Sequence, residues 1–394
     1  MENNDIVIIT ARRTPIGSFQ GQFASLSAPQ LGACTIRAVI DDARYDSAAI
    51  DEVLMGCVLQ AGLGQAPARQ AARRAGIPDA VAATTINKVC GSGMKAIMLG
   101  HDMIRAGTAE VIVAGGMESM SNAPYLLPGA RTGYRSGHQQ VLDHMILDGL
   151  QNVDDGELMG FFAEQCVDRY QFTRAAQDGY AAESVQRACR ALQAGDFREE
   201  ICAVTVAGKQ GKITVSEDEY PPRCHPEKLA GLQPVFRPAG GTVTAASSAA
   251  IADGAAALLL MRAQRAQQAG LRALARIVAH SSHARKPEEF TLAPGPAIQR
   301  LYEVTGWSAA EVDLYEINEA FAAVVMAAMR DLRLEHAKVN VNGGACALGH
   351  PIGASGARLV VSLVHALRRR NLRRGIAALC IGGGEATALA VELL

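Results

Sequence analysis

Strand-like and helix-like hydrophobic patterns alternate along the first part of the chain. Short apolar and β-branched runs predict strands at residues 5–10, 53–59, 81–87 and 110–114. Apolar residues at helical spacing predict helices at residues 27–43, 65–75 and 94–106. Because buried strands that alternate with helices are typical of α/β proteins, we expect an α/β fold with a mostly buried sheet.

The same alternation returns near the C-terminal end. Here the pattern predicts strands at 312–317 and 376–381 and helices at 319–330 and 357–369. Residues 111–118 and 378–385 each form an apolar run that ends in glycines and a glutamate. This similarity indicates that the two ends of the chain are related halves produced by an internal duplication.

The segment between these regions, residues 119–241, has a different character. Proline, glycine, tyrosine and charged residues become frequent, and one strong helix is predicted at 174–194. Long loops within compact domains are often functional. We therefore interpret this segment as an insertion that covers a substrate.

Composition narrows the possible partners of the chain. Its 394 residues are 20% charged with a formal net charge of -1, so no strong field attracts nucleic acid or an anionic membrane. No run is long and apolar enough to cross a bilayer, and the first residues lack the basic start of a secretion signal. We expect a cytoplasmic protein with no nucleic-acid or membrane partner.

The nine cysteines do not form a recognisable framework. Their number is odd and no C-x-x-C pair occurs, which argues against structural disulfides and a cysteine zinc site. No metal ion or cofactor is expected. Most of these cysteines are expected to be small buried residues, unless their surroundings are unusual.

Cys90 has such surroundings. It stands in Cys90–Gly93, between a predicted strand and a predicted helix. A helix N-terminus stabilises a thiolate, and the glycines permit a sharp turn that brings substrate close to the backbone. A buried structural cysteine in a tight turn is the alternative interpretation.

Three further signals lie at similar junctions. His350 stands among glycines just before a predicted helix, where an imidazole can exchange a proton with a nearby thiol. Cys380 ends a predicted strand, directly before Gly382–Gly384, whose N–H groups could hold an oxyanion. Asn318 precedes a predicted helix and could act as its N-cap or hold a carbonyl near His350.

Four motifs that contain these residues resemble the thiolase family, in the same order and over nearly the whole chain. They are Asn87–Gly93, Asn318–Phe321, Gly349–Gly353 and Cys380–Gly384. The resemblance implies the thiolase fold: two related βαβαβαββ halves that form a five-layered α-β-α-β-α core with an inserted loop domain. We expect an N-terminal half at 1–120, completed by about 245–270, an inserted domain at 121–244 and a C-terminal half at 271–394.

The resemblance also implies roles for individual residues. It implies that Cys90 accepts the acyl group, that His350 activates it, and that Cys380 removes a proton from the α-carbon of a second acetyl-CoA. Asn318 and His350 would stabilise the enolate oxygen, and the backbone N–H groups of Cys90 and Gly382 would form the other oxyanion hole. The implied partners are acetyl-CoA, acetoacetyl-CoA and CoA, in a homotetramer or homodimer.

Substrate contacts are predicted with the same alignment, although several positions depart from the family pattern. The expected contacts are Met159, Phe161, Arg223, Ala249, Ala320 and Phe321. The departures are Leu158 in place of a histidine, Ala249 in place of a serine, Ala386 in place of a glycine, Leu292–Pro296 in place of a Met-Gly-x-Gly-Pro element, and the pair Phe161–Phe162. We expect the two phenylalanines to narrow or reshape the acyl pocket.

Other functions remain open at this stage. A ketoacyl-carrier-protein synthase uses a Cys-His-His arrangement, which Asn318 and Cys380 do not match. A degradative 3-ketoacyl-CoA thiolase with longer substrates is closer, and a non-catalytic acyl-CoA-binding protein belongs to a different class. The pattern favours an acyltransferase of the acetyl-CoA C-acetyltransferase type and leaves the physiological direction open.

Overall fold

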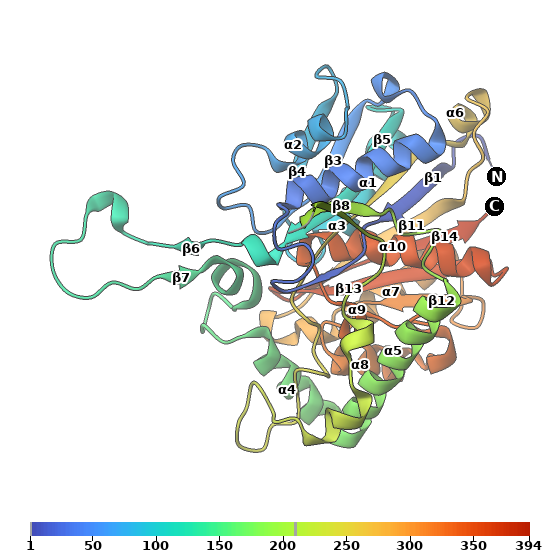
Figure 1. Cartoon of the computed structure of the whole chain (residues 1–394). Coiled ribbons are helices and arrows are strands. Elements are labelled where there is room, and N and C mark those ends of the chain that lie inside the picture. Colours follow the sequence, from blue (N-terminus) through green and yellow to red (C-terminus); the bar gives the residue numbers. More distant parts are fainter. Residues whose placement is uncertain (1, 209–210) are drawn as a thin grey trace.

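The computed structural model describes residues 2–208 and 211–394, and its main feature is one large mixed sheet (Figure 1). Within these residues ten strands form a sheet in the order β12-β13-β14-β11-β1-β10-β5-β3-β4, with the short β2 paired to β10. The strands are β1 (Ile6–Arg13), β2 (Gly17–Ser18), β3 (Glu52–Gly56), β4 (Ala82–Ile86), β5 (Val111–Ser119), β10 (Ala252–Arg262), β11 (Ala275–Ala284), β12 (Leu314–Ile317), β13 (Arg374–Ile381) and β14 (Glu385–Leu393).

The sheet consists of two similar parts that meet where β1 pairs with β11. In the first part β5 lies parallel to β3 and antiparallel to β10; in the second, β13 lies parallel to β12 and antiparallel to β14. Strands β5 and β13 therefore occupy equivalent places, as the internal duplication predicts. The matched runs differ at their ends, because residues 111–118 lie within β5 whereas residues 382–384 form the turn from β13 to β14. Figure 1 shows both termini close together at one end of this sheet.

Helices cover the sheet on both faces and fill the space between its two parts. They are α1 (Ala28–Ala43), α2 (Pro67–Arg74), α3 (Ser92–Ala106), α6 (Ala263–Gln268), α7 (Pro294–Thr305), α8 (Ala322–Leu332), α9 (Ala345–Leu348) and α10 (Ile352–Arg369). One cluster of buried residues joins α1 and α2 to the first part, and another joins α7 and α8 to the second. A third cluster places α3 and α10 between the two parts. The result is the five-layered thiolase arrangement that the sequence predicts.

Strand β1 shows why a strand between two helical layers is apolar on both sides. Alternate side chains of a strand point to opposite faces. Ile6 and Ile8 pack toward α3 and α10, whereas Val7 and Ile9 pack toward α1. Since both faces are covered, the strand is a continuous hydrophobic run rather than an alternating one.

The segment between β5 and β10 contains more regular structure than its composition suggests. It holds the helices α4 (Met159–Tyr170) and α5 (Arg174–Ala194) and two hairpins, β6 (Tyr125–Leu126) with β7 (Leu142–Asp143) and β8 (Val204–Gly208) with β9 (Gly211–Val215). The hairpin of β6 and β7 projects away from the rest of the chain (Figure 1).

Two predicted helix starts are wrong. The helix expected from Glu319 begins at Ala322, with Phe321 as its N-cap, so the proposed N-cap role of Asn318 fails. Asn318 directly follows β12 instead, and its backbone N–H donates to Ala378 O on β13 at 2.9 Å. The helix expected from Ala357 already begins at Ile352, one turn and more earlier, after the N-cap Pro351.

Glycines at the start of α10 explain why its first turns were not predicted as helix. A Cβ atom on Gly356 would lie 2.5 Å from Met94 N, and one on Gly93 would lie 2.9 Å from Ala357 N. The first turns of α3 and α10 thus touch backbone to backbone, and glycine is needed at this contact. The glycines favour close helix packing here, whereas read along the chain alone they suggest a loop.

None of the described helices is long and apolar enough to cross a membrane.

Candidate active site

The four predicted catalytic residues come together around one cavity of about 520 Å³. Cys90 precedes α3, His350 precedes α10, Cys380 lies near the end of β13, and Asn318 follows β12. Cys90, His350, Cys380 and Gly382 line the cavity itself. Asn318 lies behind them, fully buried, with its Nδ2 atom 3.4 Å from His350 Nε2.

The turn that carries Cys90 is held by local hydrogen bonds. Val89 has a φ of 46°, a conformation that a β-branched residue adopts only under strain. The Asn87 side chain accepts a hydrogen bond from Val89 N–H at 2.9 Å, and Ser92 Oγ donates to Val89 O at 2.6 Å. A Cβ atom on Gly91 would lie 2.4 Å from Ile381 Cδ1, so a larger residue here would displace the Ile381 side chain of β13. The strained turn presents the Cys90 thiol to the cavity.

The thiol of Cys90 is protonated at neutral pH. Burial raises its pKa to about 11, and hydrogen bonds from the backbone N–H groups of Gly382 and Cys90 only partly oppose this rise. These are the two donors that the sequence predicts for an oxyanion hole, and both point at the sulfur. An acyl group on Cys90 would place its carbonyl oxygen close to them.

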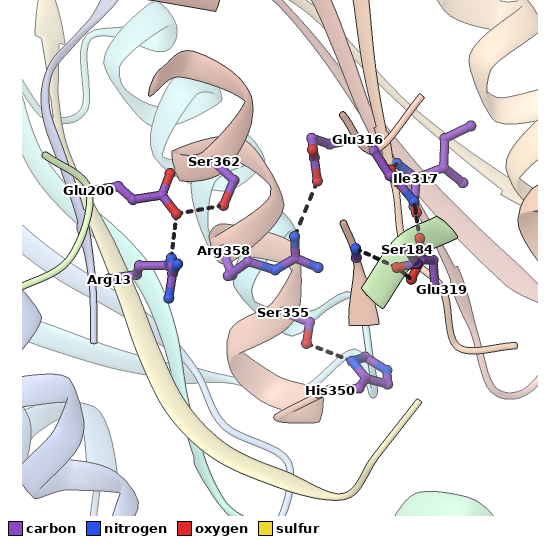
Figure 2. Close-up of polar contacts among 12 residues, drawn as sticks. Arg13, Ser184, Glu200, Glu316, Ile317, Glu319, His350, Ser355, Arg358 and Ser362 are labelled. Atoms are coloured by element: carbon purple, nitrogen blue, oxygen red, sulfur yellow. Dashed lines mark hydrogen bonds and ion pairs between the residues drawn. The ribbon is translucent and has the colours of Figure 1, made fainter. Parts of the chain in front are cut away.

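His350 is buried and neutral. Burial, and then the positive charge of Arg358, lower the pKa of its imidazole to about 3. Arg358 is itself buried and its Nη1 atom lies 3.2 Å from Glu316 Oε2 (Figure 2). The thiol and the imidazole are therefore both uncharged at rest, so His350 can take the proton of Cys90 only as the sulfur attacks.

Ser355, which the sequence reading missed, holds the ring of His350. Its Oγ atom lies 2.6 Å from His350 Nδ1 (Figure 2). The same atom donates to Pro351 O at 3.0 Å. The hydroxyl can accept a hydrogen bond from Nδ1–H while it donates one to Pro351 O. In this arrangement the proton of the ring is on Nδ1, and Nε2 can act as a base. The hydroxyl can also donate to Nδ1, which lets Nε2–H act as a donor. The sequence signal for Ser355 was its position, five residues after His350 within one glycine-rich run.

Two buried carboxylates fix the loops around these residues. Glu118, at the end of β5, accepts backbone hydrogen bonds from Val58 at 3.0 Å, Leu59 at 3.1 Å and Gly353 at 2.8 Å, and burial raises its pKa to about 7. Glu319 accepts hydrogen bonds from Tyr180, Ser184, Asn340 and the backbone of Cys346, at 2.7 to 3.0 Å. Glu118 therefore anchors the start of α10, and Glu319 anchors the segment before α8.

Cys380 is almost completely enclosed. It is 1% exposed, and burial followed by the nearby Cys90 raises its pKa well above the usual range of a thiol. Its backbone pairs with Ala386 on β14, which is also fully buried. A substrate α-proton can reach this thiol only from the cavity.

Apolar side chains form the remaining wall of the cavity. Four of the predicted contacts, Met159, Ala249, Ala320 and Phe321, line it, as does Leu158. Residues that the sequence reading missed include Met120, Ile146, Leu150, Phe236, Ser248 and Phe290. Phe321 packs edge to face against Phe236 and Phe290, with ring centroids 5.8 and 6.4 Å apart.

The pair Phe161–Phe162 does not narrow this cavity, which corrects our expectation. Neither ring is part of its lining, and Phe162 is 2% exposed in the core beside α8. Both follow Met159 and Gly160 on α4, and the turn of the helix carries them away from the side that faces the cavity. The ring of Phe236 borders the cavity instead. It packs directly on Gly160, where an added Cβ would lie 2.3 Å from the ring.

Arg223 also lies outside the cavity lining. Its guanidinium is largely exposed and forms an ion pair with Glu219 at 2.8 Å. The described structure thus gives it no contact with the catalytic residues.

Comparison with known proteins agrees with this geometry. Residues 6–264 match the thiolase N-terminal domain and residues 271–393 match the thiolase C-terminal domain. The fold and the site define a class of protein in which two similar halves of a sheet place two thiols and an imidazole beside one cavity. The chain belongs to the thiolase family.

Individual relatives are similar over nearly their whole length. The chain is 49% identical to an acetyl-CoA acetyltransferase of Pseudomonas aeruginosa over 98% of both chains. It is 48% identical to an acetyl-CoA acetyltransferase of Escherichia coli, over 98% of this chain and 99% of the relative. Among solved structures, the Acat5 thiolase of Ascaris suum in complex with coenzyme A superposes with a TM-score of 0.94 at 42% identity, covering 99% of this chain and 100% of that one.

We predict that replacing Ser355 by alanine lowers kcat about tenfold or more, because His350 then loses the partner that fixes its ring in either protonation form. Steady-state kinetics in both reaction directions would measure the loss. Ser362→Ala is the matched control, since Ser362 lies on the same helix but donates to Glu200 at 3.2 Å. Equal activity of the two variants would contradict the role of Ser355.

We also predict that the alkylation rate of Cys90 by iodoacetamide rises about tenfold per pH unit through the neutral range. Because the raised pKa of about 11 leaves little thiolate at pH 7, the reactive fraction increases as pH increases toward that value. Peptide mass spectrometry would follow Cys90 separately from the other thiols. A plateau below pH 8 would instead indicate a preformed thiolate–imidazolium pair.

Proposed function

We propose that this chain is an acetyl-CoA C-acetyltransferase, which reversibly condenses two acetyl-CoA molecules to acetoacetyl-CoA and CoA. The observation that carries the proposal is the apolar cavity lined by two thiols, Cys90 and Cys380, and by His350. The relatives of the same name support the choice of substrate.

In the first half of the reaction the Cys90 sulfur forms a bond to the acetyl carbon and the bond to the CoA sulfur breaks. His350 Nε2 takes the thiol proton during the attack and gives it to the departing CoA thiolate. The negative oxygen of the intermediate is stabilised by the N–H groups of Cys90 and Gly382, each such donor contributing about 3 to 4 kcal/mol. The product is an acetyl group on Cys90.

In the second half the Cys380 thiol gives its proton to His350 Nε2, and the resulting thiolate removes a proton from the methyl carbon of another acetyl-CoA. The Nε2–H of His350 and the Asn318 side chain stabilise the enolate oxygen, while Ser355 Oγ accepts a hydrogen bond from His350 Nδ1–H. The carbanion attacks the acetyl carbon and expels the Cys90 thiolate, which regains a proton from His350 Nε2. Two thiols are needed because Cys90 is acylated when a base must act.

The proposal extends to the state of the enzyme. We infer that it works in the cytoplasm as a homotetramer or homodimer and needs no cofactor besides its CoA thioester substrates. The hairpin of β6 and β7 supports self-association, because it projects outward and exposes the large apolar side chains Tyr125, Leu127 and Val141.

We predict that Cys380→Ala traps the acetyl-enzyme. Acetylation needs only Cys90 and His350, so this variant should gain one acetyl group from acetyl-CoA yet form acetoacetyl-CoA at least about a hundredfold more slowly. Intact-protein mass spectrometry measures the first step and product formation the second. Cys90→Ala should lose both, and Cys189→Ala, a half-buried thiol outside the cavity, should lose neither. Acetylation of Cys90→Ala at another residue would contradict the mechanism.

We predict that thiolysis is fastest with acetoacetyl-CoA and falls as the ketoacyl chain lengthens, because Phe236, Phe290 and Phe321 enclose the cavity. Measuring kcat/KM over a series of ketoacyl-CoA chain lengths tests this. Equal or higher values for long chains would identify a 3-ketoacyl-CoA thiolase instead. A protein that binds these thioesters without turnover would be a non-catalytic relative.

A further inference from the structure

A second group of reactive side chains lies away from the cavity, where α3 meets β11. His101 and Asp102 come from the second half of α3, and His280 comes from the middle of β11. Asp102 Oδ1 lies 3.0 Å from His101 Nδ1 and 2.8 Å from His280 Nε2. The two imidazole rings meet edge to face with centroids 5.1 Å apart. Two imidazoles and one carboxylate thus converge on one point.

The spacing of these atoms is close to that of zinc ligands. Zinc binds histidine nitrogen and carboxylate oxygen at about 2.0 to 2.2 Å, so tetrahedral ligand atoms lie about 3.4 Å apart. One ligand atom of each of the three residues lies within 4.8 Å of the other two. Small side-chain rotations would therefore bring all three atoms into contact with one ion.

The surroundings of the cluster give an ion a buried side and an open side. His101 is 5% exposed, whereas the side chain of Asp102 is 51% exposed toward solvent. Asp102 Oδ1 lies within hydrogen-bond distance of both ring nitrogens, and a bound cation would take the place of the ring protons at this point. Arg105 brings a positive charge near the cluster.

We propose that His101, Asp102 and His280 form a zinc site that joins the two halves of the thiolase fold. The ligands are His101 Nδ1, Asp102 Oδ1 and His280 Nε2, with the proton of each imidazole on its other nitrogen. Three protein ligands leave a fourth position for water, and the side chain of Asp102 is 51% exposed toward solvent. Because α3 belongs to the N-terminal domain and β11 to the C-terminal domain, the bound ion would link them.

The site was not visible in the sequence because its third ligand comes from a distant part of the chain. His101 and Asp102 are adjacent, but Asp102 and His280 are 178 positions apart. The cluster is separate from the catalytic cavity, since none of its residues lines it. The proposal therefore does not depend on the proposed acetyl transfer.

Zinc binding to the purified full chain tests the proposal. The thiols are first alkylated with iodoacetamide, so that cysteines cannot hold the ion, and the zinc affinity is measured by competition with a chromogenic chelator. We expect about one zinc per chain for the wild type, and at least about tenfold weaker binding for His280→Gln and Asp102→Asn. His283→Gln is the matched control, because His283 lies on the same strand outside the cluster.

Thermal unfolding before and after zinc addition gives the second readout. A ligand that binds the folded state raises Tm. Zinc should raise Tm for the wild type and for His283→Gln and leave it unchanged for the two ligand variants. Circular dichroism spectra check that each variant is folded. If His280→Gln does not fold, Asp102→Asn, which preserves side-chain size, decides the question. Weak binding by the wild type, or zinc binding that neither ligand variant alters, would show a hydrogen-bonded cluster only and overturn the proposal.

Discussion

Helices α3 and α10 cross with almost no side chain between their first turns, and the active site depends on this contact. Gly93 and Gly356 bring the two backbones together, and Gly116 lies so close that an added Cβ would sit 2.1 Å from Gly353 O. The residues just before each helix, Cys90 and His350, are thereby placed beside the same cavity. Any side chain in this contact would force the nucleophile and its base apart.

Burial also keeps the site uncharged. It leaves Cys90 as a thiol and His350 as a neutral imidazole, so neither has the large cost of an isolated buried charge. In the proposed reaction the backbone N–H groups of Cys90 and Gly382, and the side chains of Asn318 and Ser355, would be in place for the charges that arise. Preorganised donors are most effective where water is excluded.

The inserted segment supplies the walls of the cavity and is tied to the core by buried ion pairs. Arg13 on β1 is fully buried and forms ion pairs with Glu200 at 2.6 Å and Asp218 at 2.7 Å, both from the segment between β5 and β10 (Figure 2 shows the first). Glu200 also accepts a hydrogen bond from Ser362 of α10 at 3.2 Å. Losing one partner would leave a buried charge unpaired, so these contacts fix how the segment docks.

The sequence alone predicted many of the strands and helices, the relationship between the two ends, and the four candidate catalytic residues that the fold brings together around one cavity. Hydrophobic periodicity reports which face of an element is buried, and the glycine-rich motifs stand out because unusual backbone conformations demand them. It did not determine where α8 and α10 begin, that Phe236 rather than Phe161 borders the cavity, that Ser355 holds His350, or that His280 meets His101 and Asp102. Those features depend on which faces meet across the fold, and only the tertiary structure decides that, because the contacting residues are far apart along the chain or are oriented by the packing around them.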